Sequence, residues 1–170
     1  MPAPLLLLLT VLLGAPLPAR ADDLIVLLEA GSCPNCTLAD ADLVHADLRD
    51  ANLKAADLRR ANLSRARLDG ADLRDADLRF SSLKGASLRG SNLRGARLDG
   101  TDLRQADLSG ALIKPGALDR SHWLGAMGIN QGQRSPASLH NAGVDEANAG
   151  RWPQAERLFG EAIQADPEQA

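Results

Sequence analysis

Aromatic residues are scarce in this chain, whose 170 residues include two tryptophans, two phenylalanines and no tyrosine. Proteins that bind single-stranded nucleic acid stack the bases on aromatic side chains beside a basic groove. Here the basic residues that recur at intervals of 20, namely Lys54, Arg74, Arg94 and Lys114, have no aromatic residues interleaved with them, so this kind of binding has no support in the sequence. We expect no nucleic acid among the partners of the protein.

The residue types that most often carry catalysis or bind metals are also few. The sequence has three widely separated histidines and two cysteines, which are His45, His122, His140, Cys33 and Cys36. No Ser/His/Asp constellation, phosphate-binding glycine loop or set of metal ligands accompanies them. Two thiolates alone do not complete a tetrahedral zinc site. The sequence therefore predicts that the protein is not an enzyme and has no catalytic residues, cofactor or metal.

No apolar run in the chain is long enough to span a bilayer as a helix. The longest, Leu5–Leu13, is interrupted only by Thr10 and is followed by Ala19-Arg20-Ala21, which matches the A-x-A cleavage pattern. We predict a signal peptide over residues 1–21, export to the periplasm, a lumen or the medium, and no membrane span after cleavage. Without Arg20 the chain carries 22 acidic and 18 basic residues, a balance that argues against general attraction to nucleic acid or membranes.

A five-residue period dominates the middle of the chain. Leucine returns at every fifth position from Leu38 to Leu118, with Ile113 as the one substitute, and two residues before each lies a small residue, mostly alanine. We number the positions of a repeat 1 to 5, so that the small residue takes position 1 and leucine position 3. A strand has period two and a helix period 3.6, so neither keeps every fifth residue on one side. The pattern predicts a coil that turns by a fixed angle at each repeat, around a continuous core.

The repeats A-D-L-R-D at 46–50, A-N-L-K-A at 51–55 and A-D-L-R-R at 56–60 resemble the pentapeptide repeat family. The resemblance covers residues 36–120. It implies a mainly β fold, a right-handed quadrilateral parallel β-helix with four repeats per coil, so that each repeat stacks on the fourth one after it at about 4.8 Å. Some members of the family imitate DNA and bind type II topoisomerases. Residues 36–120 hold 13 aspartates and 15 lysines and arginines, so this rod lacks the negative charge that such imitation needs.

A short helix over Leu24–Ala30 is expected to cover the first coil, because an uncovered end exposes core leucines and unpaired backbone groups. Asp22 or Asp23 is suited to cap its start, and Gly31 to close its end. This N-terminal segment, 22–35, also contains Cys33 of the motif Cys33-Pro-Asn-Cys36. The motif has three interpretations: a structural disulfide, two buried free thiols, or a redox-active dithiol that exchanges with a partner. Export favours a disulfide that joins the covering helix to the first coil.

The five-residue rule weakens after Ile113, and we expect a connector over 121–135 followed by a helical hairpin. The connector has apolar side chains suited to plug the far end of the coil, namely Trp123, Leu124, Met127 and Ile129. Ser135-Pro136 is typical of a helix start, so helices are predicted over 136–148 and 152–165.

Residues 136–170 resemble a single tetratricopeptide repeat. The residues that carry the resemblance are Gly143, Ala155, Phe159, Ala162 and Pro167, with Trp152 near the start of the second helix. A single repeat has no neighbouring repeats with which to bury its surface. The hairpin is therefore expected either to cap the coil or to offer an apolar groove to a partner.

Several exposed residues are candidates for partner contact. Lys54, Arg74, Arg94 and Lys114 recur at every fourth repeat and are expected to form one basic column, which we call the basic stripe. Such a column is either a solvated charged face or a docking surface for an acidic partner. The isolated aromatic residue Phe80 and the hairpin residues Trp152 and Phe159 are further candidates. Together these features predict a non-catalytic, exported scaffold or interaction module whose partner is another protein.

Overall fold

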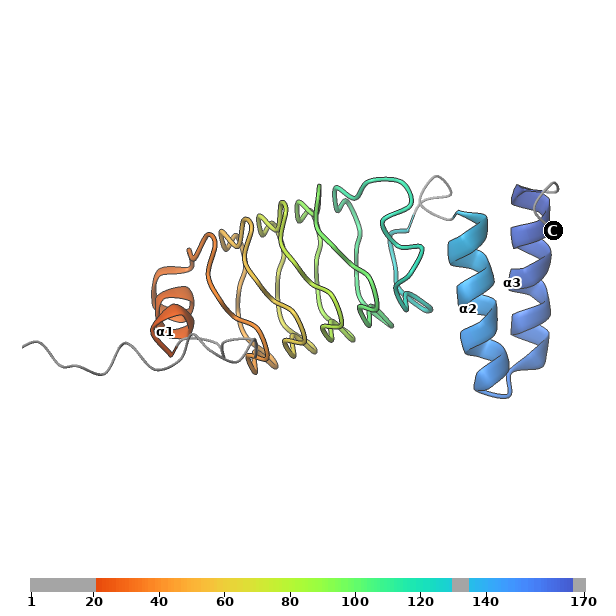
Figure 1. The fold of residues 1–170 in the computed structure, drawn as a ribbon, viewed down its shortest axis with the longest axis horizontal. Helices are drawn as coiled ribbons and strands as arrows, with labels where there is room; N and C mark the ends of the chain where they lie inside the picture. Colours follow the sequence, from red (N-terminus) through yellow and green to blue (C-terminus); the bar gives the residue numbers. More distant parts are fainter. Residues whose placement is uncertain (1–20, 130–134, 167–170) are drawn as a thin grey trace, which may run out of the picture.

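The computed structural model describes residues 21–129 and 135–166, and it contains a rod with one helix at one end and two at the other (Figure 1). The helices are α1 (Ala21–Ala30), α2 (Pro136–Asn148) and α3 (Trp152–Ala165). Apart from Ala21, the predicted signal peptide lies outside the described residues. No helix in the described part of the chain is long and apolar enough to cross a membrane.

The rod is a stack of coils, each made of four repeats. Parallel β-bridges join the residues at position 2 to their counterparts four repeats later, from Ser32 with Asn52 to Asp107 with Met127, and within this range Arg97 alone has no bridge to the following coil. The predicted number of repeats per coil is thus confirmed. Within residues 21–129 these bridges are isolated and form no extended strand. The chain turns after every bridge, so each side of the coil is too short for the continuous strands that the expected β fold suggested.

Backbone hydrogen bonds explain why the coil repeats so regularly. The amides at positions 3 and 5 donate to the next coil, as in Leu38 N to Asp57 O (2.8 Å) and Asp40 N to Arg59 O (2.9 Å). Between repeats, Ala41 N donates to Leu38 O (3.1 Å) and closes a turn. The third residue of every turn from Asn35 to Gly110 has a positive φ, 60° at Asp40 for example, as in a type II turn. Glycine is the least strained residue there, which accounts for its frequency at position 5 in the later repeats.

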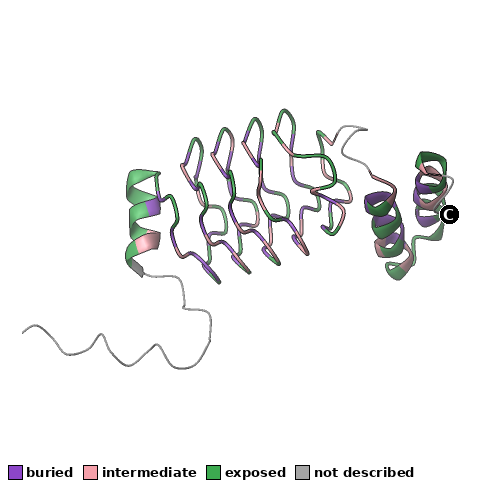
Figure 2. Ribbon diagram, turned by 45° about the horizontal axis from the view of Figure 1, so that its top comes forward, coloured by how far each residue is buried: buried purple, intermediate pink, exposed green. Residues whose placement is uncertain are grey.

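Leucine at position 3 and the small residue at position 1 fill the inside of the coil. Leu53, Leu73 and Leu83 have no exposed surface, and Ala71 has none either. Figure 2 shows buried and exposed segments alternating along every coil. Each buried leucine contributes about 1.5–3 kcal/mol.

The ladder extends beyond the expected range of 36–120 at both ends. At the start, Cys33 occupies position 3 of an earlier repeat and its amide donates to Asn52 O (2.8 Å). At the other end, His122 pairs with Asp102, and Trp123 takes position 3 with 5% of its surface exposed. Trp123 is therefore inside the last coil and does not form a separate plug. The rod amounts to almost five coils, because the bridges run from Ser32 to Met127 with four repeats in each coil.

One corner of the last coil is irregular, where the sequence reads Lys114-Pro115-Gly116. From Asn35 to Gly90 the amide at position 5 bonds to a carbonyl at position 4 of the next coil, but Gly100 N donates to Arg120 O, at position 5 (2.6 Å). Proline has no amide to donate, and Gly116 has a φ of 78°. The ladder resumes its regular spacing at His122.

Helix α1 covers the first coil. It begins at Ala21, three residues before the predicted start, so Asp22 and Asp23 lie in its first turn and do not cap it. The Asp23 carboxylate instead accepts a hydrogen bond from Thr37 N (2.9 Å), which ties the helix to the coil. Leu27 is 1% exposed and belongs to the same core as the coil leucines. Gly31 closes the helix as predicted, with a φ of 62° and its amide bonded to Leu27 O.

Helices α2 and α3 have the predicted bounds and form an antiparallel pair at the far end. Ser135 Oγ caps α2 by accepting from Ser138 N (3.1 Å). Helix α2 lies between the last coil and α3 (Figure 1). Asn141 Nδ2 donates to Asp119 O (2.5 Å), and the His122 ring is 2.7 Å from the Asp145 carboxylate. The hairpin thus covers the end of the rod through α2 and leaves α3 outermost.

Candidate interaction surface

Most arginines on the rod pair with an aspartate, often the one two residues earlier. In Asp57–Arg59, the guanidinium binds both carboxylate oxygens at 2.8 and 2.6 Å. This hydrogen bonding from Arg59 holds the pKa of Asp57 below its ordinary value. The same pairing within a repeat occurs at Asp47–Arg49, Asp72–Arg74, Asp77–Arg79 and Asp102–Arg104. Exposed pairs of this kind contribute about 0–1 kcal/mol each, and their main effect is to balance the charge.

Five cations of the repeats make no ion pair within the described residues, and they fall into two groups. Lys54, Arg94 and Lys114 belong to the basic stripe. Arg65 and Lys84 lie together at one corner of the rod. Since the other basic side chains of the coils have an aspartate partner, these two groups are where the surface carries uncompensated positive charge.

The basic stripe is a column on one side of the rod. The bonds Ala55 N to Arg74 O (2.8 Å) and Asp75 N to Arg94 O (3.1 Å) place Lys54, Arg74 and Arg94 on successive coils. Arg74 is the exception among them, because it binds Asp72 at 2.8 and 2.5 Å. Lys114 follows the last bridge on this side and begins the irregular corner. The stripe therefore presents three free cations around one neutralised pair.

The candidate contact residue Phe80 is 67% exposed, but its ring is not isolated. It lies over Gly100 in the next coil, so close that a Cβ at residue 100 would be 2.6 Å from the ring. Packing of the Phe80 ring on the backbone of Gly100 thus accounts for the exposed ring and for the glycine. No partner protein is needed to explain either residue. Trp152, at the start of α3, is 64% exposed.

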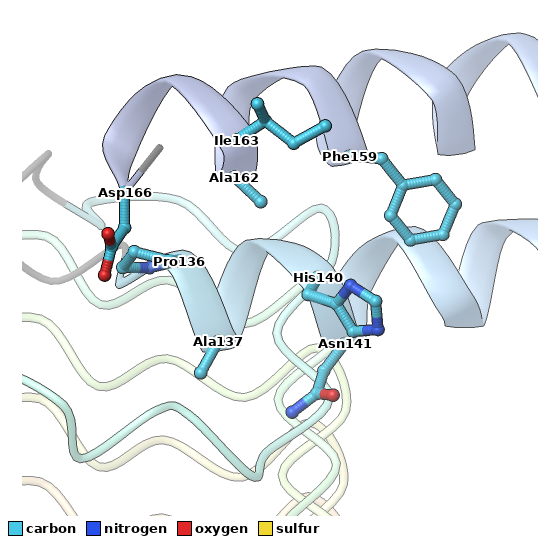
Figure 3. Close-up of a pocket in the computed structure, with 8 residues that line it drawn as sticks. All are labelled: Pro136, Ala137, His140, Asn141, Phe159, Ala162, Ile163 and Asp166. Carbon is cyan, nitrogen blue, oxygen red and sulfur yellow. The ribbon is translucent and has the colours of Figure 1, made fainter. Parts of the chain in front are cut away.

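The helical hairpin has an open groove between α2 and α3 (Figure 3). Phe159 of α3 points toward His140 of α2, with ring centroids 5.3 Å apart. Pro136 and Ile163 continue the groove toward the end of α3, and Ile163 is 53% exposed. Sequence reasoning identified Phe159 but missed His140 and Ile163. The spacing of four residues between 159 and 163 was the available signal, since it places both on one helix face.

Cys33 and Cys36 form a disulfide within the first coil, with Cα atoms 5.5 Å apart. Cys33 takes position 3 and Cys36 position 1 of the next repeat, the places that leucine and alanine occupy elsewhere, as at Leu38 and Ala41. The disulfide therefore replaces a core contact and does not join α1 to the coil, which was the expected role. The two cysteines are 2% and 9% exposed, and thiol exchange needs an accessible sulfur. The Asp23 carboxylate is near both sulfurs, but sulfurs in a disulfide are not thiolate ligands.

Reduction of this disulfide is expected to lower the free energy of unfolding by about 2 kcal/mol, the cost predicted for so short a loop. The double variant Cys33→Leu/Cys36→Ala installs the residues of the other repeats and should unfold at the same urea concentration with or without reductant. Urea titrations of both proteins, followed by circular dichroism, measure the effect. A double variant that fails to fold, while Cys33→Ser/Cys36→Ser does fold, would contradict the interpretation of the disulfide as a core contact.

Comparisons with known proteins agree with the repeat architecture. Residues 36–75 and 71–110 match the family of pentapeptide repeats. A pentapeptide repeat protein from Nostoc PCC 7120 is 40% identical, with 59% of this chain and 79% of that chain covered and a TM-score of 0.48. One from the Arabidopsis thaliana thylakoid lumen is 30% identical, with 56% and 61% covered and a TM-score of 0.45.

A third structure is HetL, a pentapeptide repeat protein from Nostoc involved in the regulation of heterocyst differentiation. It is 31% identical, with 56% of this chain and 46% of that chain covered and a TM-score of 0.44. The chain thus spans less than two thirds of the length of HetL and of the thylakoid protein. No significant match to a curated protein is found.

Proposed function

Because the chain belongs to the pentapeptide repeat family, we propose that it is a scaffold whose basic stripe binds an acidic surface of another protein. Members of this family are generally non-catalytic and fold as right-handed quadrilateral β-helices. A rigid rod of this kind holds side chains at fixed spacing, which lowers the entropy lost on binding.

The observation that supports this proposal is the free charge of Lys54, Arg94 and Lys114 on a rod that otherwise pairs most of its cations. Complementary charge steers a partner to the correct face and increases the association rate more than it increases affinity. The binding should therefore weaken as salt rises, since the Debye length is about 8 Å at physiological ionic strength. The cations of the stripe lie on successive coils at a regular spacing, and an acidic protein surface has the opposite charge needed to bind such a column.

Two further parts of the proposal concern location and the hairpin. The apolar run and cleavage pattern of residues 1–21 support export, and a disulfide is consistent with an oxidising compartment. The hairpin groove, with Phe159 inside it and Trp152 on the same helix, is the second contact that we assign to this protein partner. The resemblance of the hairpin to a tetratricopeptide repeat remains a prediction.

The alternative functions have less support. A thiol–disulfide role for Cys33 and Cys36 conflicts with their burial. Imitation of DNA requires an acidic surface, whereas the residues of 36–120 sum to +2 from 15 cations and 13 aspartates.

Photo-crosslinking tests the basic stripe directly. A photoreactive residue at Ala55, exposed beside Lys54, should crosslink one defined protein in the exported fraction, whereas one at Ser109 on another side should not. The variant Lys54→Glu/Arg94→Glu should abolish the crosslink.

The matched control is Arg65→Glu/Lys84→Glu, which makes the same change in net charge away from the stripe and should retain the crosslink. Equal loss in both double variants would show that total charge matters and the stripe does not. A crosslink that persists in Lys54→Glu/Arg94→Glu would overturn the proposal.

A further inference from the structure

The second group of free cations lines a hollow at another corner of the rod, which we call the corner notch. Backbone bonds set its residues on successive coils: His45 N to Ser64 O (3.1 Å), Arg65 N to Lys84 O (2.9 Å) and Gly85 N to Arg104 O (2.9 Å). The lining residues come from four coils and are Val44, His45, Asn62, Ser64, Arg65, Lys84, Gly85 and Gln105. The notch is on a different side of the rod from the basic stripe, and its chemistry is independent of the function proposed for that stripe.

The absence of a side chain at residue 85 helps to make the hollow. Gly85 has a φ of 67°, and a Cβ there would contact Arg65 Cγ at 3.6 Å. The stem of Arg65 thus crosses the glycine, in the way that Phe80 covers Gly100 at another corner. Here the residue that lies over the glycine is a cation, so the hollow has a charged group at its edge.

The polar atoms of the notch are mainly hydrogen-bond donors. Asn62 Oδ1 accepts from Ser64 N (3.2 Å) and Ser64 Oγ (2.7 Å). With its oxygen occupied in this way, the Asn62 amide presents Nδ2, a donor. The Arg65 guanidinium offers a planar fork of donors and the Lys84 ammonium a compact charge, the two groups that proteins use for phosphate and related anions.

The acidic residues near the notch do not neutralise it. Asp102 on the same side is held by Arg104 at 2.8 and 2.6 Å. Asp47 beyond the corner binds Arg49 at 2.7 and 2.6 Å and lies 3.6 Å from Arg67. Asp42, in the first coil, is bridged to Asn62 and accepts from Val44 N (3.3 Å), but it is not among the lining residues and forms no ion pair with Arg65 or Lys84. Two cations and an amide donor thus share one hollow without a carboxylate in its lining.

We propose that the corner notch is a binding site for a tetrahedral oxyanion of the phosphate or sulfate type. Arg65 and Lys84 supply charge-assisted hydrogen bonds, Asn62 Nδ2 supplies a neutral one, and Gly85 places no side chain of its own in the hollow. The anion is either a free ion or the phosphate of a lipid head group, since the chemistry of recognition is the same.

The free-ion arm is a titration of the full chain with inorganic phosphate, followed by NMR of the Arg65 Nε–H and Asn62 side-chain amide signals. Ionic strength is held constant with chloride at about 0.15 M, where nonspecific attraction is screened. Saturable shifts at these two groups are expected. Arg65→Glu/Lys84→Glu should weaken binding by at least about tenfold, equivalent to about 1.4 kcal/mol, and Lys54→Glu/Arg94→Glu should leave it unchanged.

A steric variant separates the hollow from the charge. Gly85→Asn adds a side chain at a corner where His45 and Arg65 have φ values of 61° and 58° in the first two coils, so the backbone tolerates it. This variant should fold, by circular dichroism, and still bind phosphate more weakly than the wild type. Unchanged binding would remove Gly85 from the proposal.

The lipid arm is cosedimentation with vesicles of phosphatidylglycerol, with phosphatidylcholine vesicles as the control. Binding to phosphatidylglycerol alone, lost in Arg65→Glu/Lys84→Glu but retained in Lys54→Glu/Arg94→Glu, would assign the oxyanion to a lipid. Saturable phosphate binding without vesicle binding would assign it to a free ion. Absence of both, or equal loss of binding in the two charge variants, would overturn the site.

Discussion

The substitution Ala71→Phe is expected to lower the free energy of unfolding by about 3 kcal/mol, near the upper end of measured overpacking costs. Ala71 is at position 1, has no exposed surface, and lies inside a corner between two coils. Its amide bonds to Leu68 O (3.1 Å), and its carbonyl accepts from Asn92 N (2.9 Å), so the backbone on both sides is fixed. A phenyl ring at this place must push two coils apart or displace buried leucines.

Arg74→Phe is the control, because it adds the same ring three residues later on the outside of the same repeat. It removes the Asp72–Arg74 pair, whose arginine and aspartate side chains are 46% and 28% exposed, so the expected loss is at most about 1 kcal/mol. Urea unfolding followed by circular dichroism measures both variants. Equal losses would contradict the assignment of position 1 to the inside of the coil.

The substitution Gly128→Ala should open the last coil and release the hairpin. Residue 128 is at position 3, where leucine is found in the regular repeats, and its φ is 80°. A Cβ there would lie 2.3 Å from Ser109 N and 2.6 Å from Leu108 C, both backbone atoms that have no rotamer to adopt. Loss of this contact exposes Leu108 and Trp123, so the expected cost is several kcal/mol, typical of a disrupted core.

The matched control is Gly90→Ala, at a corner with a φ of 65° and no atom within 4 Å of the added Cβ. It should cost only about 1–2 kcal/mol, the strain of a left-handed residue. Hydrogen exchange distinguishes the two variants, because Gly128→Ala should deprotect the amides of His122 and Met127 while those of the first coils stay protected. Protection of His122 and Met127 in Gly128→Ala would show that the last coil tolerates the clash.

The parts of the fold that follow from the sequence are those that a strict period determines. Leucine at every fifth position requires a corner in every repeat, and with four corners to a coil the stacking of Lys54, Arg74 and Arg94 follows by arithmetic. The bounds of α2 and α3 follow from Ser135-Pro136 and from the turn Asn148-Ala149-Gly150.

The limits of the rod were less predictable, because its ladder depends on the backbone and not on leucine itself. Cys33 and Trp123 both occupy position 3, yet neither has the side chain by which the repeat is recognised. The start of α1 was predicted three residues too late. The prediction used Asp22 or Asp23 as the cap, but the Asp23 carboxylate binds Thr37 N in the coil and is not available for capping.

The candidate surfaces needed the structure for a different reason. The sequence places basic residues in columns, but it does not say which arginine an aspartate binds. Pairing within a repeat neutralises Arg74 and leaves Arg94 free, although both belong to the basic stripe. The corner notch also depends on what is missing at Gly85, a feature that no motif marks.

The coil of four five-residue sides has a consequence for how this protein tolerates insertions and deletions. Adding four repeats lengthens the rod by one complete coil and leaves every later side facing the same way. Adding a single repeat instead turns everything downstream by a quarter revolution, so the hairpin would point in a new direction relative to Lys54 and Arg94. Changes in repeat number are thus a means of re-aiming the C-terminal helices as well as of setting their distance.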